Sequence, residues 1–162
     1  MKKVAGTKVN KKVPEIRISF HPKVKPALLP KVSCARSAYE LFLESWNIRT
    51  IELREEARMM YLNSSHAVVG YHLLGIGGVG STVLDLRLKY AVAVKCCVIS
   101  LILAHSHPSD STKPSEADKL TTSYMVQSGF ILGIQLLDHL IITRHKFYSF
   151  ADNGLLDRIT VC

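Results

Sequence analysis

Apolar and polar residues alternate along the chain in two periods, one typical of helices and one typical of strands. A helical period between residues 37 and 46 predicts a helix, which Ser33 or Ser37 can cap. Its apolar face consists of Ala38, Leu41, Phe42 and Trp46. Two apolar runs, at 54–62 and 67–74, flank a short polar segment and predict a β-hairpin.

The second half of the chain also changes repeatedly between helical and extended patterns. Asp85 is placed to cap a helix over about 86–97, and another helix is predicted over 116–128, ending at Gly129. The run 99–104 is apolar on both sides, as in a strand buried on both faces of a sheet. Further strand-like runs cover 134–143 and 147–150. Helices interleaved with strands predict an α/β sheet protein.

The predicted helix over 86–97 has a less regular apolar face than the others. Lys95 interrupts that face, which otherwise consists of Leu88, Ala91, Val92, Val94 and Val98. Cys96 and Cys97, near the helix end, are expected to be small buried apolar residues. None of the four cysteines forms a CxxC pair, which indicates free thiols in a reducing compartment.

Residues 1–32 form a basic leader whose composition differs from that of residues 33–162. The leader has nine Lys or Arg residues and one acid, whereas the rest has twelve of each. Its prolines disfavour a helix and suit an extended strap, in which Ile16, Ile18 and Phe20 can pair as an edge strand. Such a tail can bind nucleic acid nonspecifically through phosphates, although Lys-rich termini are more often simply solvated.

Length and hydropathy limit the class of protein. The 162 residues suit a single domain after the leader, and no apolar run is long enough to cross a bilayer. The basic start is not followed by the apolar stretch of a secretory signal, so a cytoplasmic protein is expected. The glycine-rich segment 75–82 lacks the Lys-Ser/Thr ending of a phosphate loop and is interpreted as a flexible loop.

The segment HSHPSDSTKPSEAD, at 105–118, contains the chain's strongest candidate for chemistry. Because alternate side chains of a strand share a face, His105 and His107 should point the same way, with Ser106 turned away. Asp118, in the first turn of the next helix, can add an oxygen ligand. Two His and one carboxylate leave one tetrahedral position open for water, as in catalytic zinc sites.

A simpler interpretation of part of this segment is structural. Ser115 and Asp118 have the spacing of a capping box, in which a serine starts a helix and a carboxylate three residues later bonds back to it. Asp138-His139 is a second polar pair in an apolar run. We expect this pair to make hydrogen bonds that support the fold or the ligands rather than to bind the metal itself.

The same segment resembles the JAMM motif of the JAB/MPN zinc metallopeptidases, and most closely the RadC-like branch. LREEARMMYLN, GSTVLDLRL, LLDHLIIT and YSFADNGLL extend the resemblance to about residues 33–156. It implies a JAB/MPN, cytidine-deaminase-like architecture with a mixed sheet flanked by helices. At two positions, Ser106 and Asp110, the family usually has Asn and Gly.

The resemblance also implies a role for each residue of the motif. His105, His107 and Asp118 fall on the zinc ligands, and Ser115 falls on the residue that steadies the oxyanion. Glu55 falls on the general-base glutamate, with Glu56 as its competitor; strand geometry allows only one of them to face the site. The implied function is zinc-dependent hydrolysis of an amide or isopeptide bond in a peptide or protein substrate.

An alternative function belongs to another class of protein. RadC-like proteins are commonly associated with DNA repair, and the chain can instead be a non-catalytic repair or mobile-element accessory protein. Its contact with DNA would then depend on the basic leader, because residues 33–162 carry no net charge and no groove-reading motif.

Overall fold

The computed structural model describes residues 16–21, 23–77 and 85–156. Three α-helices, a short 3₁₀ helix and five strands follow one another in this part of the chain. In chain order they are η1 (Pro26–Leu28), α1 (Ala35–Ser45), β1 (Glu56–Leu62), β2 (Val68–Ile76), α2 (Leu86–Lys95), β3 (Ser100–Ser106), α3 (Glu116–Leu132), β4 (Gln135–Ile142) and β5 (Phe147–Ser149).

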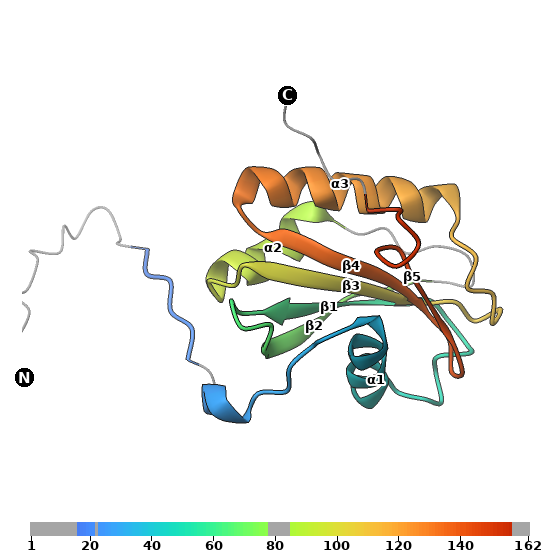
Figure 1. The fold of residues 1–162 in the computed structure, drawn as a ribbon, viewed down its shortest axis with the longest axis horizontal. Helices are drawn as coiled ribbons and strands as arrows, with labels where there is room; N and C mark the ends of the chain where they lie inside the picture. The colour runs from blue at the N-terminus through green and yellow to red at the C-terminus, as the bar shows by residue number, and fades with distance from the viewer. Residues whose placement is uncertain (1–15, 22, 78–84, 157–162) are drawn as a thin grey trace, which may run out of the picture.

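The strands form one mixed sheet in the order β2-β1-β3-β4-β5. Strands β3 and β4 run parallel, as the intervening helix α3 allows, and the other neighbours are antiparallel. Helix α1 covers one face of the sheet, and α2 and α3 cover the other (Figure 1). The predicted α/β fold, a mixed sheet flanked by helices, is therefore confirmed.

Alternation along the central strands divides the core into two layers. Met60 of β1 and Ile102 of β3 pack toward α1, whereas Met59 and Leu103 pack toward α2 and α3. All seven residues of β3 are buried, which confirms the prediction of a strand covered on both faces. Because β3 also pairs with a strand along each edge, it is held by packing on both faces and by hydrogen bonds on both sides.

The predicted hairpin is present, with bounds that differ slightly from the apolar runs. Strand β1 begins at Glu56, so Glu55 lies just before it, and the turn is held by the Asn63 side chain, which accepts from the Ser65 and Ala67 amides. Of the glycine-rich segment, residues 75–76 complete β2. Residues 78–82 of the expected flexible loop lie outside the described residues.

The predicted end of the helix at Gly129 is wrong, because α3 continues to Leu132 and ends at Gly133. Gly133 adopts φ +66°, the left-handed conformation that favours glycine at a helix end. Gly129 has a different role. A Cβ at that position would lie 2.2 Å from the Ile134 carbonyl oxygen and 2.9 Å from the Tyr90 hydroxyl, so glycine permits close packing.

The predicted apolar face of α2 is also wrong. Leu88 is 60% exposed and Val94 is 48% exposed, whereas Lys89, Tyr90 and Ala93 are buried against the sheet. Tyr90 anchors this face by donating from its hydroxyl to the Met125 carbonyl. The face of α2 that packs against the sheet is thus rotated away from the face that carries the predicted apolar residues. The expected burial of the two adjacent cysteines is wrong for Cys97, which is exposed with φ +51°, and Cys96 is only half-buried.

The leader does not form the predicted edge strand. Ile16, Ile18 and Phe20 are exposed and unpaired within the described residues, and this extended segment leads away from the sheet (Figure 1). Near the end of the leader, the backbone joins the hairpin, where Lys31 bridges Ala67. Five of the nine basic residues lie in 1–15, outside the described residues, so nucleic-acid binding stays a prediction. No helix in the described ranges is long and apolar enough to span a membrane.

The inward rotation of α2 buries a lysine. Lys89 is 2% exposed, so its ammonium is almost entirely removed from water. Burial lowers the pKa of Lys89 to about 8, against a smaller opposing effect of Asp85. The ammonium is therefore held in the fold at a free-energy cost at neutral pH.

Lys89→Met should increase the free energy of unfolding at pH 7 by about 1–3 kcal/mol, because a tenfold change in proton affinity corresponds to about 1.4 kcal/mol. The folded-state pKa is lowered, so the unfolded chain binds more protons between about pH 8 and 10.5, and stability contributed by this site rises through that window. Urea denaturation at several pH values measures both effects. Lys95→Met, an exposed change on the same helix, is the control; a less stable Lys89→Met protein at pH 7 would contradict the prediction.

Candidate metal centre

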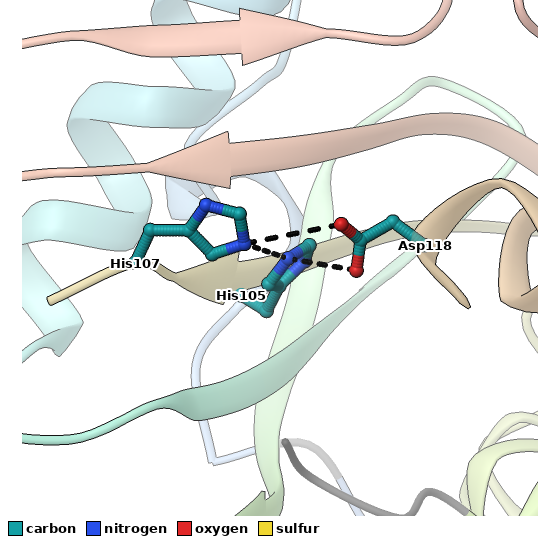
Figure 2. Close-up of side chains that lie close together, drawn as sticks. All are labelled: His105, His107 and Asp118. Atoms are coloured by element: carbon teal, nitrogen blue, oxygen red, sulfur yellow. Dashed lines mark hydrogen bonds and ion pairs between the residues drawn. The ribbon is translucent and has the colours of Figure 1, made fainter. Parts of the chain in front are cut away.

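Three side chains converge where β3 ends and α3 begins. His105 is the penultimate residue of β3, His107 follows that strand, and Asp118 lies in the first turn of α3. Nε2 of His105 is 2.9 Å from Nε2 of His107 and 3.2 Å from Oδ1 of Asp118. His107 Nε2 is 3.9 Å from the other carboxylate oxygen. Figure 2 shows the two rings and the carboxylate pointing toward one another.

The Asp118 carboxylate also belongs to the capping box of α3. Its Oδ2 accepts from the Ser115 hydroxyl at 2.6 Å and from the Ser115 amide at 2.8 Å, while the Asp118 amide donates to the Ser115 hydroxyl oxygen. Burial raises the pKa of Asp118, but its bonds to His105 and Ser115 outweigh burial and hold that pKa well below its ordinary value. The capping prediction is confirmed, and the same carboxylate stays ionised with Oδ1 directed at His105.

Hydrogen bonds to the far side of each ring determine which nitrogen faces the cluster. His107 Nδ1 is 2.7 Å from the Ser111 carbonyl oxygen, which can only accept, so Nδ1 carries the hydrogen. His105 Nδ1 is 2.8 Å from His139 Nε2. Which of these two nitrogens donates depends on the partner at the far side of His139.

That partner is Thr122. Its hydroxyl donates to the Asp118 carbonyl at 2.7 Å and therefore accepts from His139 Nδ1, also at 2.7 Å. Burial, with a contribution from His105, lowers the pKa of His139 far below its ordinary value, so this ring is neutral. His139 Nε2 then accepts from His105 Nδ1. In neutral rings, the Nε2 atoms of His105 and His107 both keep their lone pairs.

The consequence is a cluster of electron-pair donors that suits a cation. Two imidazole nitrogens and a carboxylate oxygen, one from each of His105, His107 and Asp118, all lie within 4.8 Å of one another. When both rings are neutral, these three donors can bind one cation, which takes the place of the hydrogen bond between His105 Nε2 and Asp118 Oδ1. Nitrogen and carboxylate donors with a supported histidine are typical of transition-metal sites.

Glu55 and Glu56 occupy opposite sides of the sheet. Glu55 lines a cleft of about 590 Å³ together with the three ligand-type residues, Ser115 and His139. Glu56 is buried on the α1 side, where it bonds with Arg54, Arg58 and Thr50. Burial raises the pKa of Glu56, but those bonds reverse the effect and lower it. Of the two carboxylates, Glu55 is thus the one placed at the cleft.

The remaining predicted residues divide into those at the site and those that support it. Ser115 lines the cleft, although its hydroxyl donates to Asp118. Asp138 faces away from the ligands and accepts from Ser149 and from the Ala151 amide, so it ties β4 to the chain around β5. The expectation of a supporting role for Asp138-His139 agrees with this geometry. Sequence reasoning missed Thr122, because its importance depends on a contact between α3 and β4.

Thr122→Val removes the only described acceptor for His139 Nδ1 while keeping the side chain's shape. We expect metal affinity to fall about 10- to 100-fold, as is usual when a group that orients a ligand is lost. Competition with a chromophoric chelator measures this affinity. Ser123→Ala, which removes a hydroxyl from the next residue of α3, should bind metal as the wild type does. Equal affinity in the Thr122→Val protein would contradict the inferred hydrogen-bond chain.

Comparison with known proteins adds an independent result. A family model described as RadC-like JAB domain matches residues 32–155. A UPF0758 protein of Flavobacterium johnsoniae is 42% identical over 101 residues, covering 62% of this chain and 44% of the relative. The UPF0758 protein YfjY of Escherichia coli is 40% identical over 103 residues, 64% of either chain. One from Staphylococcus carnosus is 32% identical over 127 residues, covering 78% of this chain and 55% of the relative. This chain thus spans about 44–64% of the length of these relatives.

Proposed function

This chain belongs to the RadC-like JAB domain family, and on that basis we propose that it is a zinc-dependent hydrolase that cleaves an amide bond in a peptide or isopeptide. One observation carries the proposal. The three ligand-type residues and Glu55 line the same cleft. A metal-ligand set beside an uncommitted carboxylate is the combination that metal-assisted hydrolysis requires.

The ligand set favours zinc in its catalytic rather than its structural form. His105, His107 and Asp118 provide three protein ligands and leave a fourth tetrahedral position for a small molecule, whereas structural zinc sites use four protein ligands. Bound zinc would supply Lewis acidity, which polarises a carbonyl and makes hydroxide available near pH 7. No other described His, Cys, Asp or Glu residues form a comparable cluster.

Two other residues have roles that follow from their positions. Glu55 takes the proton from the attacking water and returns it to the departing amine, because it is the cleft carboxylate without a committed partner among the described residues. Ser115 and the first turn of α3 line the same cleft. They can stabilise negative charge on the substrate oxygen once the Ser115 hydroxyl exchanges its Asp118 partner.

The proposal is tested with the purified 162-residue chain. We expect about one zinc per chain by elemental analysis and cleavage of at least one member of a mixed set of internally quenched peptides and lysine-branched isopeptides. Chelation should abolish cleavage and added zinc should restore it. A protein that takes up no zinc from zinc-containing buffer, or that cleaves equally well after chelation, would overturn the proposal.

A further inference from the structure

Ser106 lies between two of the ligand-type histidines, yet its side chain serves the opposite face of the sheet. It is fully buried, at 0% exposure, on the side covered by α1. Strands β1 and β3 are paired as far as Ala57 and His105. Beyond that pair the backbone ladder stops, and the next residue of β3, Ser106, contacts the chain that leads into β1.

The Ser106 hydroxyl replaces the missing ladder bonds. Its Oγ accepts from the Glu56 amide at 3.0 Å and donates to the Arg54 carbonyl at 3.2 Å. These two groups belong to the residues immediately before and after Glu55. One hydroxyl therefore fixes the backbone on both sides of the residue that turns toward the cleft.

Two further features hold the same segment. The Glu55 carbonyl accepts from the Gly77 amide at 2.9 Å, which attaches this residue to the end of β2. The Glu56 carboxylate is paired with Arg58 at 3.0 Å, and the Arg58 guanidinium lies 4.6 Å from the centre of the Trp46 ring. Glu56 is thus committed to the buried face, and a slip of one residue would break these contacts.

We propose that Ser106 is a positioning residue: its hydroxyl fixes the peptide groups that flank Glu55 and so directs the Glu55 carboxylate, rather than that of Glu56, into the metal cleft. The inference rests on the proposed function of Glu55 as the base. Under this inference, Ser106 positions the general base and does not support the metal ligands. Its side chain lies on the opposite face of the sheet from those ligands. Loss of the hydroxyl should therefore affect proton transfer and leave metal affinity unchanged.

The experiment compares Ser106→Ala with Ser100→Ala, a matched control on the same strand. Ser100 is also buried, but its hydroxyl has no hydrogen-bond partner in the structure. On the best peptide found in the screen, we expect kcat of Ser106→Ala to fall roughly tenfold or more, with KM unchanged, because small displacements of a catalytic group are costly. Ser106→Thr, which keeps a hydroxyl, should recover most of this loss, and Ser100→Ala should lose none.

A double-mutant cycle shows whether the effect passes through Glu55. In a Glu55→Gln background, Ser106→Ala should cause no further loss. A readout that needs no substrate is the pH midpoint of the visible spectrum of the Co²⁺-loaded protein: Glu55→Gln should move it, and Ser106→Ala should move it in the same direction by less.

The outcomes separate this inference from the proposed function. If the wild type cleaves no substrate but the cobalt midpoints follow the expected order, positioning by Ser106 stands and the hydrolase proposal fails. If the wild type hydrolyses peptides but Ser106→Ala matches Ser100→Ala, the positioning role is overturned and the hydrolase proposal stands. A Ser106→Ala effect that persists undiminished in Glu55→Gln also overturns the positioning role.

Discussion

Replacing Glu55 with glutamine should leave zinc bound and reduce kcat about 10²- to 10⁴-fold, the usual contribution of a positioned general base. Glutamine has nearly the same shape but cannot take a proton at neutral pH. It does not remove a ligand, because Glu55 is not among the three side chains that converge on the candidate metal position. Steady-state kinetics on the best peptide, together with zinc analysis of the same preparation, measures both quantities.

A nearby carboxylate provides the control for the Glu55 experiment. Glu116, in the first turn of α3, is exposed and pairs with Lys119. Exposed pairs of this kind contribute little to stability, so Glu116→Gln should behave as the wild type does. If Glu55→Gln keeps full activity while zinc remains bound, another group accepts the proton and the assignment of Glu55 is wrong.

Replacing His107 with alanine should abolish zinc retention through purification. The loss of affinity should exceed the 10- to 100-fold expected for a group that only orients a ligand, because a donor atom itself is removed. His107 follows β3 rather than lying within it, and its ring contacts mainly His105, Asp118 and Ser111. The fold should therefore survive, which circular dichroism and thermal unfolding can check.

The control for His107 is a histidine with no part in the cluster. His72 is exposed in the middle of β2, and His72→Ala should keep one zinc per chain. Elemental analysis and chelator competition on both proteins measure the difference. Zinc retained equally by His107→Ala and the wild type would place the metal elsewhere and remove the basis for the three-ligand site.

Local sequence patterns predicted the parts of this protein that depend on neighbouring residues. A short apolar run ending in His-Ser-His is enough to predict a buried strand whose two rings face one way, because strand alternation is a local rule. The capping box at Ser115 and Asp118 is equally local. Asp110 follows the same logic: the resemblance implied a Gly at this position, and the φ of +57° found for Asp110 is one that Asp tolerates better than most residues.

The predictions that failed depend on contacts between distant segments. The face of α2 that packs inward is decided by the sheet beneath it, which accepts Lys89 and Tyr90 and leaves Leu88 exposed. Gly129 resembled a helix end, but a close approach of the Ile134 carbonyl explains it instead. The support given to His105 by His139 and Thr122 joins three elements, and no single stretch of sequence contains that information.

The dual use of Asp118, as helix cap and as cluster carboxylate, has a consequence for how a cation is acquired. Folding alone sets the carboxylate in place through Ser115, and each ring is already oriented by its own backbone or side-chain partner. The entropy of ordering the donors is lost before the ion arrives, so capture and release need no refolding. Some small domains fold only when zinc binds. This protein, in contrast, should stay folded without the ion and should exchange the ion without unfolding.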